Sequence, residues 1–248
     1  MLATTVRGGC LDLALRPDRS EDVLFASCGS YEQAVVDRFP RAADRADVEV
    51  VLSEPNMGRT SLAIAPSDPD VIYALAASND AGPGGNYRQA LHAVYRSDRG
   101  GVAGTWETRV TNRDSNYLNT LLLTNVYGGT ASDCNPSSAN AFTNMGWYIN
   151  VIAVDPTDPN RVWAAGVDWF RSEDGGRNWG LATYGGSGLP ASTHVDQHAI
   201  AFHPGYDGSG NQTAIIGSDG GVYRTTNTRP PVRSRSSLLA QGMAGSRR

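Results

Sequence analysis

The stretch AVDPTDPNRVWA, from Ala153 to Ala164, decides the fold because the chain repeats its pattern. The pattern is Ala-x-x-Pro, then a polar turn, then an aliphatic and aromatic strand that ends in Ala. It returns as ALRPDRSEDVLFA (Ala14–Ala26) and AIAPSDPDVIYA (Ala63–Ala74), and more loosely as AFHPGYDGSGNQTAIIG (Ala201–Gly217). The prolines stand at positions 17, 66, 156 and 204, so the steps between copies are 49, 90 and 48 residues. Such a period indicates one supersecondary unit used several times.

Each copy predicts a β-hairpin, because apolar runs flank a turn of Pro, Asp, Ser and Asn. Helical periodicity is absent between Leu11 and Tyr223. A period near 48 residues is within the range of four-stranded propeller blades. We therefore expect an all-β fold, an incomplete β-propeller of about three and a half four-stranded blades. The 90-residue step is interpreted as one blade with two long loops, 79–92 and 111–146, of a length that usually carries function.

A second pattern follows the first, namely an aromatic residue, Arg, Ser or Thr, an acidic residue and glycines, and then Trp. Its copies are FRSEDGGRNW (Phe170–Trp179), a stretched YRSDRGGVAGTW (Tyr95–Trp106), and YRTTN (Tyr223–Asn227), which stops early. We expect a tight hairpin in which Asp174 accepts backbone N–H bonds, the glycines take positive φ, and Trp179 packs between sheets. These residues are expected to build the fold rather than to perform chemistry.

FRSEDGGRNW resembles an Asp-box, Ser-x-Asp-x-Gly-x-Thr-Trp, with Asn178 in the place of Thr. Asp-boxes mark the bacterial-neuraminidase-repeat propellers, which include sialidases, xyloglucan-cleaving glycoside hydrolases and sortilin-type receptors. The stretch from Gly146 to Arg224 is similar to a bacterial branch described as glycosyl-hydrolase-like or sortilin-like. The resemblance covers residues 8–227. In the first blade RFPRAADRADVEVV (Arg38–Val51) stands where a box is expected, without its glycines and Trp.

The resemblance implies a module of an extracellular or cell-envelope protein that acts on or binds polysaccharide. Three interpretations stay open: a glycoside hydrolase, a non-catalytic propeller that binds a glycan or a protein, and an inactive truncated copy. Sialidase activity is disfavoured, because RFPR (Arg38–Arg41) is not the Phe-Arg-Ile-Pro signature of that group. The N-terminus has no signal-peptide pattern, which fits a partial copy.

Composition excludes several other classes of function. All 21 basic residues are Arg, which removes Schiff-base and P-loop chemistry because both need a lysine amine. The net charge of −4 argues against a nucleic-acid partner. No apolar run reaches the ~18 residues of a membrane helix. We assign no metal site and no cofactor, since the three cysteines match no zinc spacing.

Candidate catalytic residues come from HVDQH, which places His194, Asp196 and His198 at alternate positions, on one face of an extended strand. Imidazole and carboxylate groups together can perform acid–base chemistry or hold a metal, whereas in the alternative they cap a loop by hydrogen bonds. Asp168 is expected to face the central channel and to pair with Asp196 as the two carboxyls of a glycosidase. Asp168, Asp196 and His198 are thus the predicted catalytic residues, and His194 is a predicted substrate-binding residue.

Aromatic side chains at element ends and in Gly-rich loops are candidates for stacking on sugar rings; these are Trp147, Tyr148, Trp169 and Tyr184. The alternative is that they pack between sheets. Asp155 and Asp219 are expected to be turn residues whose carboxylates bond backbone N–H groups.

Cys10 and Cys28 become cross-strand partners if the PDRSED turn centres at Arg19, with Leu13 opposite Phe25. They would form a disulfide in an oxidising compartment, or else remain two small buried residues.

The expected domain is a partial propeller over residues 1–227, followed by an Arg-rich tail, 228–248, without a strand pattern. The tail has five Arg and no acidic residue, so we expect it to be disordered. The strand Leu11–Leu15 is apolar on both faces, as in a sheet packed between other sheets. An incomplete ring leaves open blade edges, and we expect the isolated chain to self-associate through them.

Overall fold

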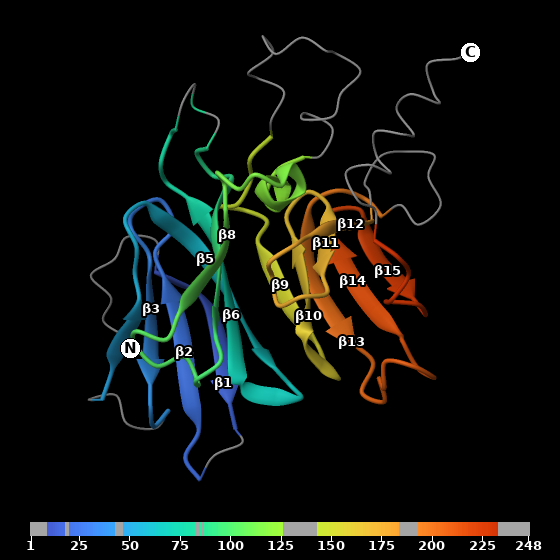
Figure 1. Cartoon of the computed structure of the whole chain (residues 1–248), viewed down its shortest axis with the longest axis horizontal. Helices are drawn as coiled ribbons and strands as arrows, with labels where there is room; N and C mark the ends of the chain where they lie inside the picture. Colours follow the sequence, from blue (N-terminus) through green and yellow to red (C-terminus); the bar gives the residue numbers. More distant parts are fainter. Residues whose placement is uncertain are drawn as a thin grey trace.

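The computed structural model describes residues 9–17, 20–42, 47–82, 85, 87–125, 143–183 and 193–232. These residues form four antiparallel sheets, which we number as blades 1 to 4 in chain order (Figure 1). Blades 1 to 3 have four strands each and blade 4 has three. The expected all-β propeller architecture is confirmed.

Each blade is a simple up-and-down meander. Blade 1 contains β1 (Cys10–Arg16), β2 (Val23–Cys28), β3 (Val35–Phe39) and β4 (Glu49–Leu52). Blade 2 contains β5 (Met57–Ala65), β6 (Asp68–Ser78), β7 (Leu91–Ser97) and β8 (Glu107–Thr111). Blade 3 contains β9 (Val151–Asp155), β10 (Asp158–Ala165), β11 (Trp169–Ser172) and β12 (Gly180–Thr183). Blade 4 contains β13 (Gln197–Phe202), β14 (Ala214–Ser218) and β15 (Gly221–Thr225).

The 90-residue step is one blade with two long connections, as expected. The first joins β6 to β7 within blade 2, and the second joins β8 to β9, between blades 2 and 3. The second contains a short 3-10 helix, η2 (Tyr117–Leu121), that the sequence pattern did not predict.

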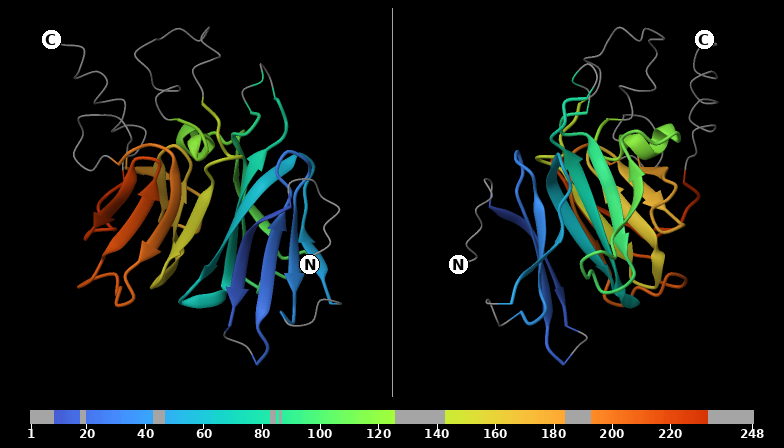
Figure 2. Two further views of the ribbon diagram at one scale, coloured as in Figure 1. Left: turned by 180° about the vertical axis from the view of Figure 1, so that it is seen from behind. Right: turned by 60° about the vertical axis from the view of Figure 1, so that its left-hand side comes forward.

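The blades pack face to face, and the first strand of each lies next to the first strand of the following one (Figure 2). Phe25 and Ile72 are fully buried between blades 1 and 2. Phe170 and Leu75 are fully buried between blades 2 and 3. Trp169 is fully buried in the core between blades 3 and 4. The chain therefore buries its apolar side chains between sheets rather than within any one of them.

The hairpin between β11 and β12 has the expected geometry. The Asp174 carboxylate accepts backbone N–H bonds from Arg177 at 3.1 Å and Asn178 at 2.9 Å. Gly175 and Gly176 adopt φ of 72° and 85°, a region that favours glycine. Burial alone would raise the pKa of Asp174, but hydrogen bonds to Asn178 and Ser172 outweigh it and lower that pKa. This carboxylate is held in a structural turn.

The stretched copy between β7 and β8 keeps part of this pattern. In both hairpins the Ser hydroxyl accepts a glycine N–H and the Trp indole donates to that glycine's carbonyl; the residues are Ser172, Gly176 and Trp179, and Ser97, Gly101 and Trp106. Arg99 stands in the place of Asp174, so the carboxylate bonds are absent there. The Ser–Gly–Trp contacts define the turn, and the carboxylate reinforces one copy of it.

The register of blade 1 differs from the expectation by one residue. Cys10 lies opposite Cys28 and forms a disulfide with it, as one of the two alternatives predicted. A bulge between Cys10 and Asp12 then shifts the pairing, so Leu13 lies opposite Ala26 rather than Phe25. The sequence offers no signal for this extra residue.

The expectation that β1 is packed on both faces is wrong for the described residues. Leu11, Leu13 and Leu15 are 44%, 59% and 52% exposed. Between them Ala14 packs in the core toward blade 2. One face of β1 is therefore covered by blade 2, and no described residue covers the other.

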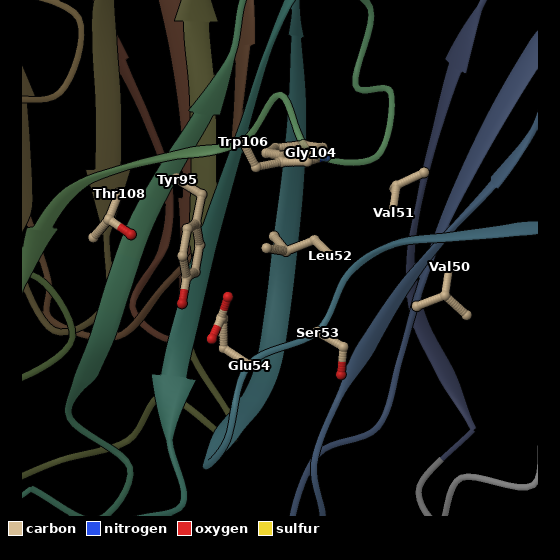
Figure 3. Close-up of a pocket in the computed structure, with 9 residues that line it drawn as sticks. All are labelled: Val50, Val51, Leu52, Ser53, Glu54, Tyr95, Gly104, Trp106 and Thr108. Atoms are coloured by element: carbon tan, nitrogen blue, oxygen red, sulfur yellow. The ribbon is translucent and has the colours of Figure 1, made fainter.

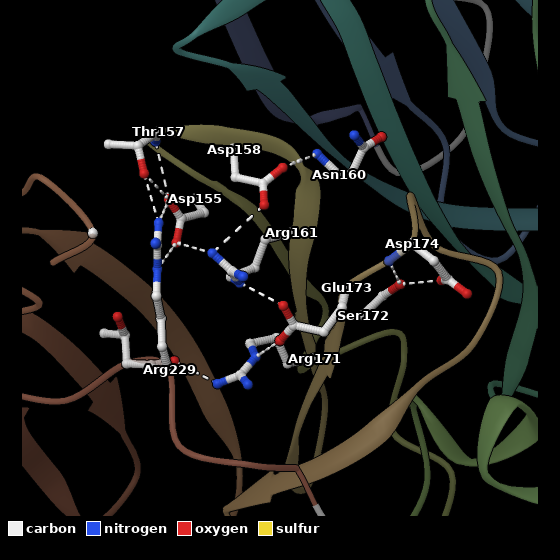
Figure 4. A network of polar contacts seen from close by, with 12 residues as sticks. Asp155, Thr157, Asp158, Asn160, Arg161, Arg171, Ser172, Glu173, Asp174 and Arg229 are labelled. Atoms are coloured by element: carbon white, nitrogen blue, oxygen red, sulfur yellow. Dashed lines mark hydrogen bonds and ion pairs between the residues drawn. The ribbon is translucent and has the colours of Figure 1, made fainter.

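The first residues assigned to the tail make specific contacts with blade 3 (Figure 4). Arg229 donates to both carboxylate oxygens of Asp155, at 2.8 and 3.2 Å. Arg171 donates to the carbonyl oxygens of Thr228 and Pro230. The boundary after residue 227 stays a prediction, and residues 233–248 lie outside the described part of the chain.

Candidate functional site

The candidate site lies at the end of the blades where β9 and β13 begin. Trp147 and Tyr148 stand just before β9, and His198 is the second residue of β13. Tyr31 reaches the same region from the β2–β3 loop of blade 1. The Asp174 hairpin lies at the opposite end of β11, so the hairpin and this site occupy different ends of the blade.

Four rings form a continuous row, which we call the aromatic strip: Tyr31, Trp147, Tyr148 and His198. Successive ring centroids are 6.3, 5.5 and 5.0 Å apart. Tyr31 is 64% exposed, Trp147 42% and Tyr148 37%. Large aromatic side chains exposed together in a row mark a ligand surface more often than single exposed ones do.

Arg59 of β5 holds the middle of the strip in place. Its guanidinium donates to the carbonyl oxygens of Trp147, at 2.9 Å, and Tyr148, at 2.5 Å. Burial lowers the pKa of Arg59, while the nearby Asp12 carboxylate acts in the opposite direction. Gly146 donates its N–H to the Gln89 carbonyl at 2.8 Å, which fixes the start of the turn. The rings thus project from a corner that is bonded to blade 2.

A hydrogen-bonded polar group ends the strip. Asp219, in the β14–β15 turn, accepts hydrogen bonds from the His198 ring at 2.6 Å and from the Tyr148 hydroxyl at 3.0 Å. These two bonds lower the pKa of Asp219, and the bond to Asp219 raises the pKa of Tyr148. Asp219 was expected to bond backbone N–H groups, and it bonds side chains from blade 4 and from the β8–β9 connection instead.

Asp196 adjoins this group through the backbone. Its carbonyl accepts the Asp219 N–H at 3.0 Å, and its own N–H donates to the Val167 carbonyl at 3.1 Å. The residue has φ of 65°, a strained conformation for a residue other than glycine. Partial burial and the charge of Asp219 raise the pKa of Asp196. Asp196 and Asp219 are two neighbouring carboxyls whose environments shift their pKa values in opposite directions.

The structure therefore brings together four of the predicted residues, and separates others from them. His198, Tyr148 and Trp147 belong to the strip. Asp196 adjoins Asp219. The ring of His194 bonds the carbonyl of Val195 at 2.9 Å, and His194 also lies near enough to Asp196 and Asp219 to act on the pKa of both.

Trp169 and Asp168 are buried instead of open to a ligand. Trp169 is 0% exposed and donates its indole N–H to the Gln197 amide oxygen at 2.7 Å. Asp168 is 3% exposed in the turn between β10 and β11. Tyr184 lies outside the described residues. Both side chains are thus buried among neighbouring residues. A catalytic role for Asp168 stays a prediction.

Within the described ranges, no group of three or more His, Cys, Asp or Glu side chains could hold a metal ion. No helix in the same ranges is long and apolar enough to cross a membrane.

Comparison with known proteins places the fold. No family model matches the sequence, and no curated protein matches it. The solved structure of the GH74 enzyme of Niastella koreensis is similar, with 15% identity and a TM-score of 0.52 over 92% of this chain and 29% of that one. An ancestral GH74 enzyme is similar with 14% identity and a TM-score of 0.50, over 89% of this chain and 23% of that one.

A structure of YCF48 bound to D1 peptide has 9% identity and a TM-score of 0.45 over 91% of this chain and 54% of that one, too low to support an argument. At these identities the GH74 structures show the fold alone. This chain spans less than a third of either of them. The chain has the β-propeller fold that the GH74 enzymes also have.

Proposed function

We propose that this chain is a polysaccharide-binding β-propeller module of the Asp-box, glycosyl-hydrolase-like type. The observation that carries the proposal is the exposed aromatic strip with the His198–Asp219 pair at its end. Sugar rings have apolar C–H faces that stack on aromatic rings, and hydroxyls that bond carboxylates and imidazoles, so the strip offers both kinds of contact. The shared fold of the GH74 enzymes supports a glycan as the ligand.

An extracellular or cell-envelope location belongs to the same proposal. The Cys10–Cys28 disulfide supports it, because disulfides persist in oxidising compartments. A sortilin-like propeller that binds protein remains the alternative to a glycan-binding one.

The proposal is tested by titrating the chain with a panel of soluble glycan oligosaccharides, including xyloglucan fragments, and measuring heat and Trp fluorescence. Trp147→Ala should lower the affinity for the tightest-binding oligosaccharide about tenfold, or about 1.4 kcal/mol, because it removes an inner ring of the strip. The unfolding temperature should not change, since Trp147 is half-exposed. Trp106→Phe, in a different hairpin, is the control and should leave the affinity unchanged. If no oligosaccharide binds, or if Trp147→Ala binds equally well, the proposal fails.

Hydrolysis of the bound glycan is a second candidate function. It is favoured by the position of Asp196 beside Asp219, whose N–H donates to the Asp196 carbonyl at 3.0 Å, because a glycosidase uses two neighbouring carboxyl groups. The raised pKa of Asp196 and the lowered pKa of Asp219 have the directions expected for an acid and a base. Asp196 would be the acid and Asp219 the base, and Asp168 is the alternative partner of Asp196. Release of reducing ends from a bound oligosaccharide would be lost in Asp196→Asn with binding retained. Comparison of Asp219→Asn with Asp168→Asn would identify the partner, and binding without turnover in the unchanged chain would leave the binding function alone.

A further inference from the structure

Two adjoining cavities of about 330 Å³ each lie beside strands β7 and β8 of blade 2. One is also lined by β4 of blade 1, and the other by the β4–β5 connection. They share the lining residues Glu54, Tyr95 and Thr108. The one that also contains Trp106, Leu52 and Ser53 is drawn in Figure 3, and we call it the inter-blade cavity. No residue of the aromatic strip lines it.

The corresponding place between blades 2 and 3 is filled. The repeated pattern aligns Tyr95 with Phe170, and Trp106 with Trp179. Phe170 is 0% exposed and Trp179 3%. Two features close this place. Leu118 and Leu121 of η2 pack in the same core, and Asn119 bonds the backbone of Arg177 and Trp179.

Between blades 1 and 2 no helix of the described residues takes the place of η2. Only residues 53–56 connect β4 to β5, which is too short for such a helix. Trp106 consequently stays partly exposed. The inter-blade cavity is therefore a vacant position in a repeated architecture, one that the chain itself fills at the next blade junction.

Two polar groups of this cavity, the Tyr95 hydroxyl and the Glu54 carboxylate, are not bonded to other described side chains. Tyr95 is 4% exposed, and its hydroxyl has no hydrogen-bond partner among the described residues. In Figure 3 this hydroxyl and the Glu54 carboxylate lie on the same side of the cavity. Glu54 is the one charged residue of the lining, and its carboxylate forms no ion pair with any residue that the structure describes. Burial, and then the charge of Glu54, raise the pKa of Tyr95.

We propose that the inter-blade cavity binds the cationic side chain, arginine or lysine, of an extended peptide that pairs with the edge of β4. β4 is the last strand of its sheet, so one side of its backbone has no partner strand among the described residues. Val48 and Val50 along this edge are 49% and 58% exposed. Addition of a peptide strand to such an edge is an established mode of recognition.

The geometry of a paired strand directs one of its side chains into the cavity. Val51 and Leu52 are buried in the core between blades 1 and 2. Residues directly opposite each other on paired strands point to the same face of a sheet. Leu52 lies opposite Val36, which is buried in the same core, whereas Val51 is the extra residue of a β-bulge between the Asp37–Val50 and Val36–Leu52 pairs. A peptide residue opposite Leu52 therefore points toward blade 2, where the cavity lies.

The lining suits a cation more than a neutral group. A guanidinium or ammonium there would be attracted by the Glu54 carboxylate and by the face of the Trp106 ring, and would donate to the Tyr95 hydroxyl. The chain already uses this combination within blade 3. There the Arg171 guanidinium lies 5.2 Å from the centroid of the Trp163 ring and donates to Glu173.

Three peptides, Thr-Val-Thr-X-Thr-Val-Thr with X as Arg, Gln or Glu, test the proposal. They are blocked at both ends, carry a fluorophore, and are titrated with the full chain at low salt by fluorescence anisotropy. The Arg peptide should bind about tenfold more tightly than the Gln peptide, and the Glu peptide most weakly. Equal affinity for Arg and Gln, or no detectable binding of the Arg peptide, overturns the proposal.

Two variants assign the effect to this cavity. Glu54→Gln should abolish the tighter binding of the Arg peptide relative to the Gln peptide. Tyr95→Phe, which introduces the residue found at the equivalent position 170, should lower the affinity for the Arg peptide about threefold. Glu21→Gln, an exposed carboxylate outside the inter-blade cavity, is the matched control and should change nothing. If Tyr95→Phe fails to fold, Glu54→Gln still tests the proposal, because Glu54 lies in the exposed connection between β4 and β5. Preference retained in Glu54→Gln, or displacement of the Arg peptide by a neutral oligosaccharide, contradicts the proposal.

Discussion

At the scale of single residues, Gly146 decides where the aromatic strip stands. A Cβ at this position would lie 2.7 Å from the Ala77 Cβ and 2.8 Å from the Gln89 carbonyl oxygen. Neither is the end of a flexible side chain, so the 146–148 turn itself has to move. Gly146→Ala should therefore have two effects. It should lower the free energy of unfolding by about 1–3 kcal/mol, and it should also weaken glycan binding.

Urea unfolding and the oligosaccharide titration check both effects. Gly217→Ala is the control, because its Cβ would meet only the Ala199 Cβ at 3.9 Å and its φ is ordinary. The free energy of unfolding of Gly217→Ala should differ from that of the unchanged chain by less than about 0.5 kcal/mol. Full stability and unchanged binding in Gly146→Ala would show that the turn tolerates the methyl group.

Residue patterns predicted part of the site for a physical reason. Trp147, Tyr148 and the HVDQH segment could be identified because polar and aromatic residues at element ends are unusual. Asp219 could not, since the GSDGG pattern identifies its turn but gives no sign of partners 21 and 71 residues away. Trp169 was misplaced because both faces of β11 are covered by neighbouring blades, which buries an aromatic residue even where a strand begins.

At the scale of elements, the turn between β9 and β10 is fastened to the segment after β15. Asp155 is 0% exposed and accepts hydrogen bonds from Arg229 and from the Tyr206 hydroxyl at 2.6 Å. Desolvation alone would raise the pKa of Asp155, but the bonds from Arg229, Tyr206 and Thr157 outweigh it and lower that pKa. Asp155→Asn should destabilise the fold by about 1–3 kcal/mol at neutral pH, because it weakens the charged hydrogen bonds of this buried carboxylate to Arg229, whose side chain is 24% exposed.

The pH dependence has a definite sign. The pKa of Asp155 is lower in the folded than in the unfolded chain. Its contribution to the free energy of unfolding is therefore complete above the unfolded pKa of about 4, and it is lost as the pH falls through the folded pKa. Chemical unfolding between neutral pH and about pH 3 should show this loss in the unchanged chain and a flatter profile in Asp155→Asn. Asp158→Asn, a partly exposed neighbour, is the control. Parallel profiles for Asp155→Asn and the unchanged chain would contradict the role of this network.

The elements were predictable because each repeat carries its own turn residues and apolar strands. What a repeat does not encode is the variation between copies. The bulge after Cys10 shifts one register, and η2 forms where a long connection finds an apolar groove between two blades. Both depend on a neighbouring sheet that the local sequence does not contain.

At the scale of the whole molecule, the two end blades each have a sheet face that no described residue covers. Leu13 is 59% exposed on blade 1, and Ile215 and Val222 are 47% and 77% exposed on blade 4. Exposed apolar area of this kind favours association by about 25 cal/mol per Å² buried. The chain should therefore sediment as oligomers whose size grows with concentration, as the incomplete ring predicts.

Leu13→Arg combined with Val222→Arg should shift the sedimentation profile toward the monomer, because an arginine on either face cannot be buried without a partner. Trp147→Arg is the matched control. It removes an exposed aromatic ring from the strip while leaving both end faces intact, so the oligomers should persist. A sharp, concentration-independent monomer in the unchanged chain would mean that the end faces are covered in solution. Loss of the oligomers in Trp147→Arg would instead place the contact at the strip, where it would compete with the glycan.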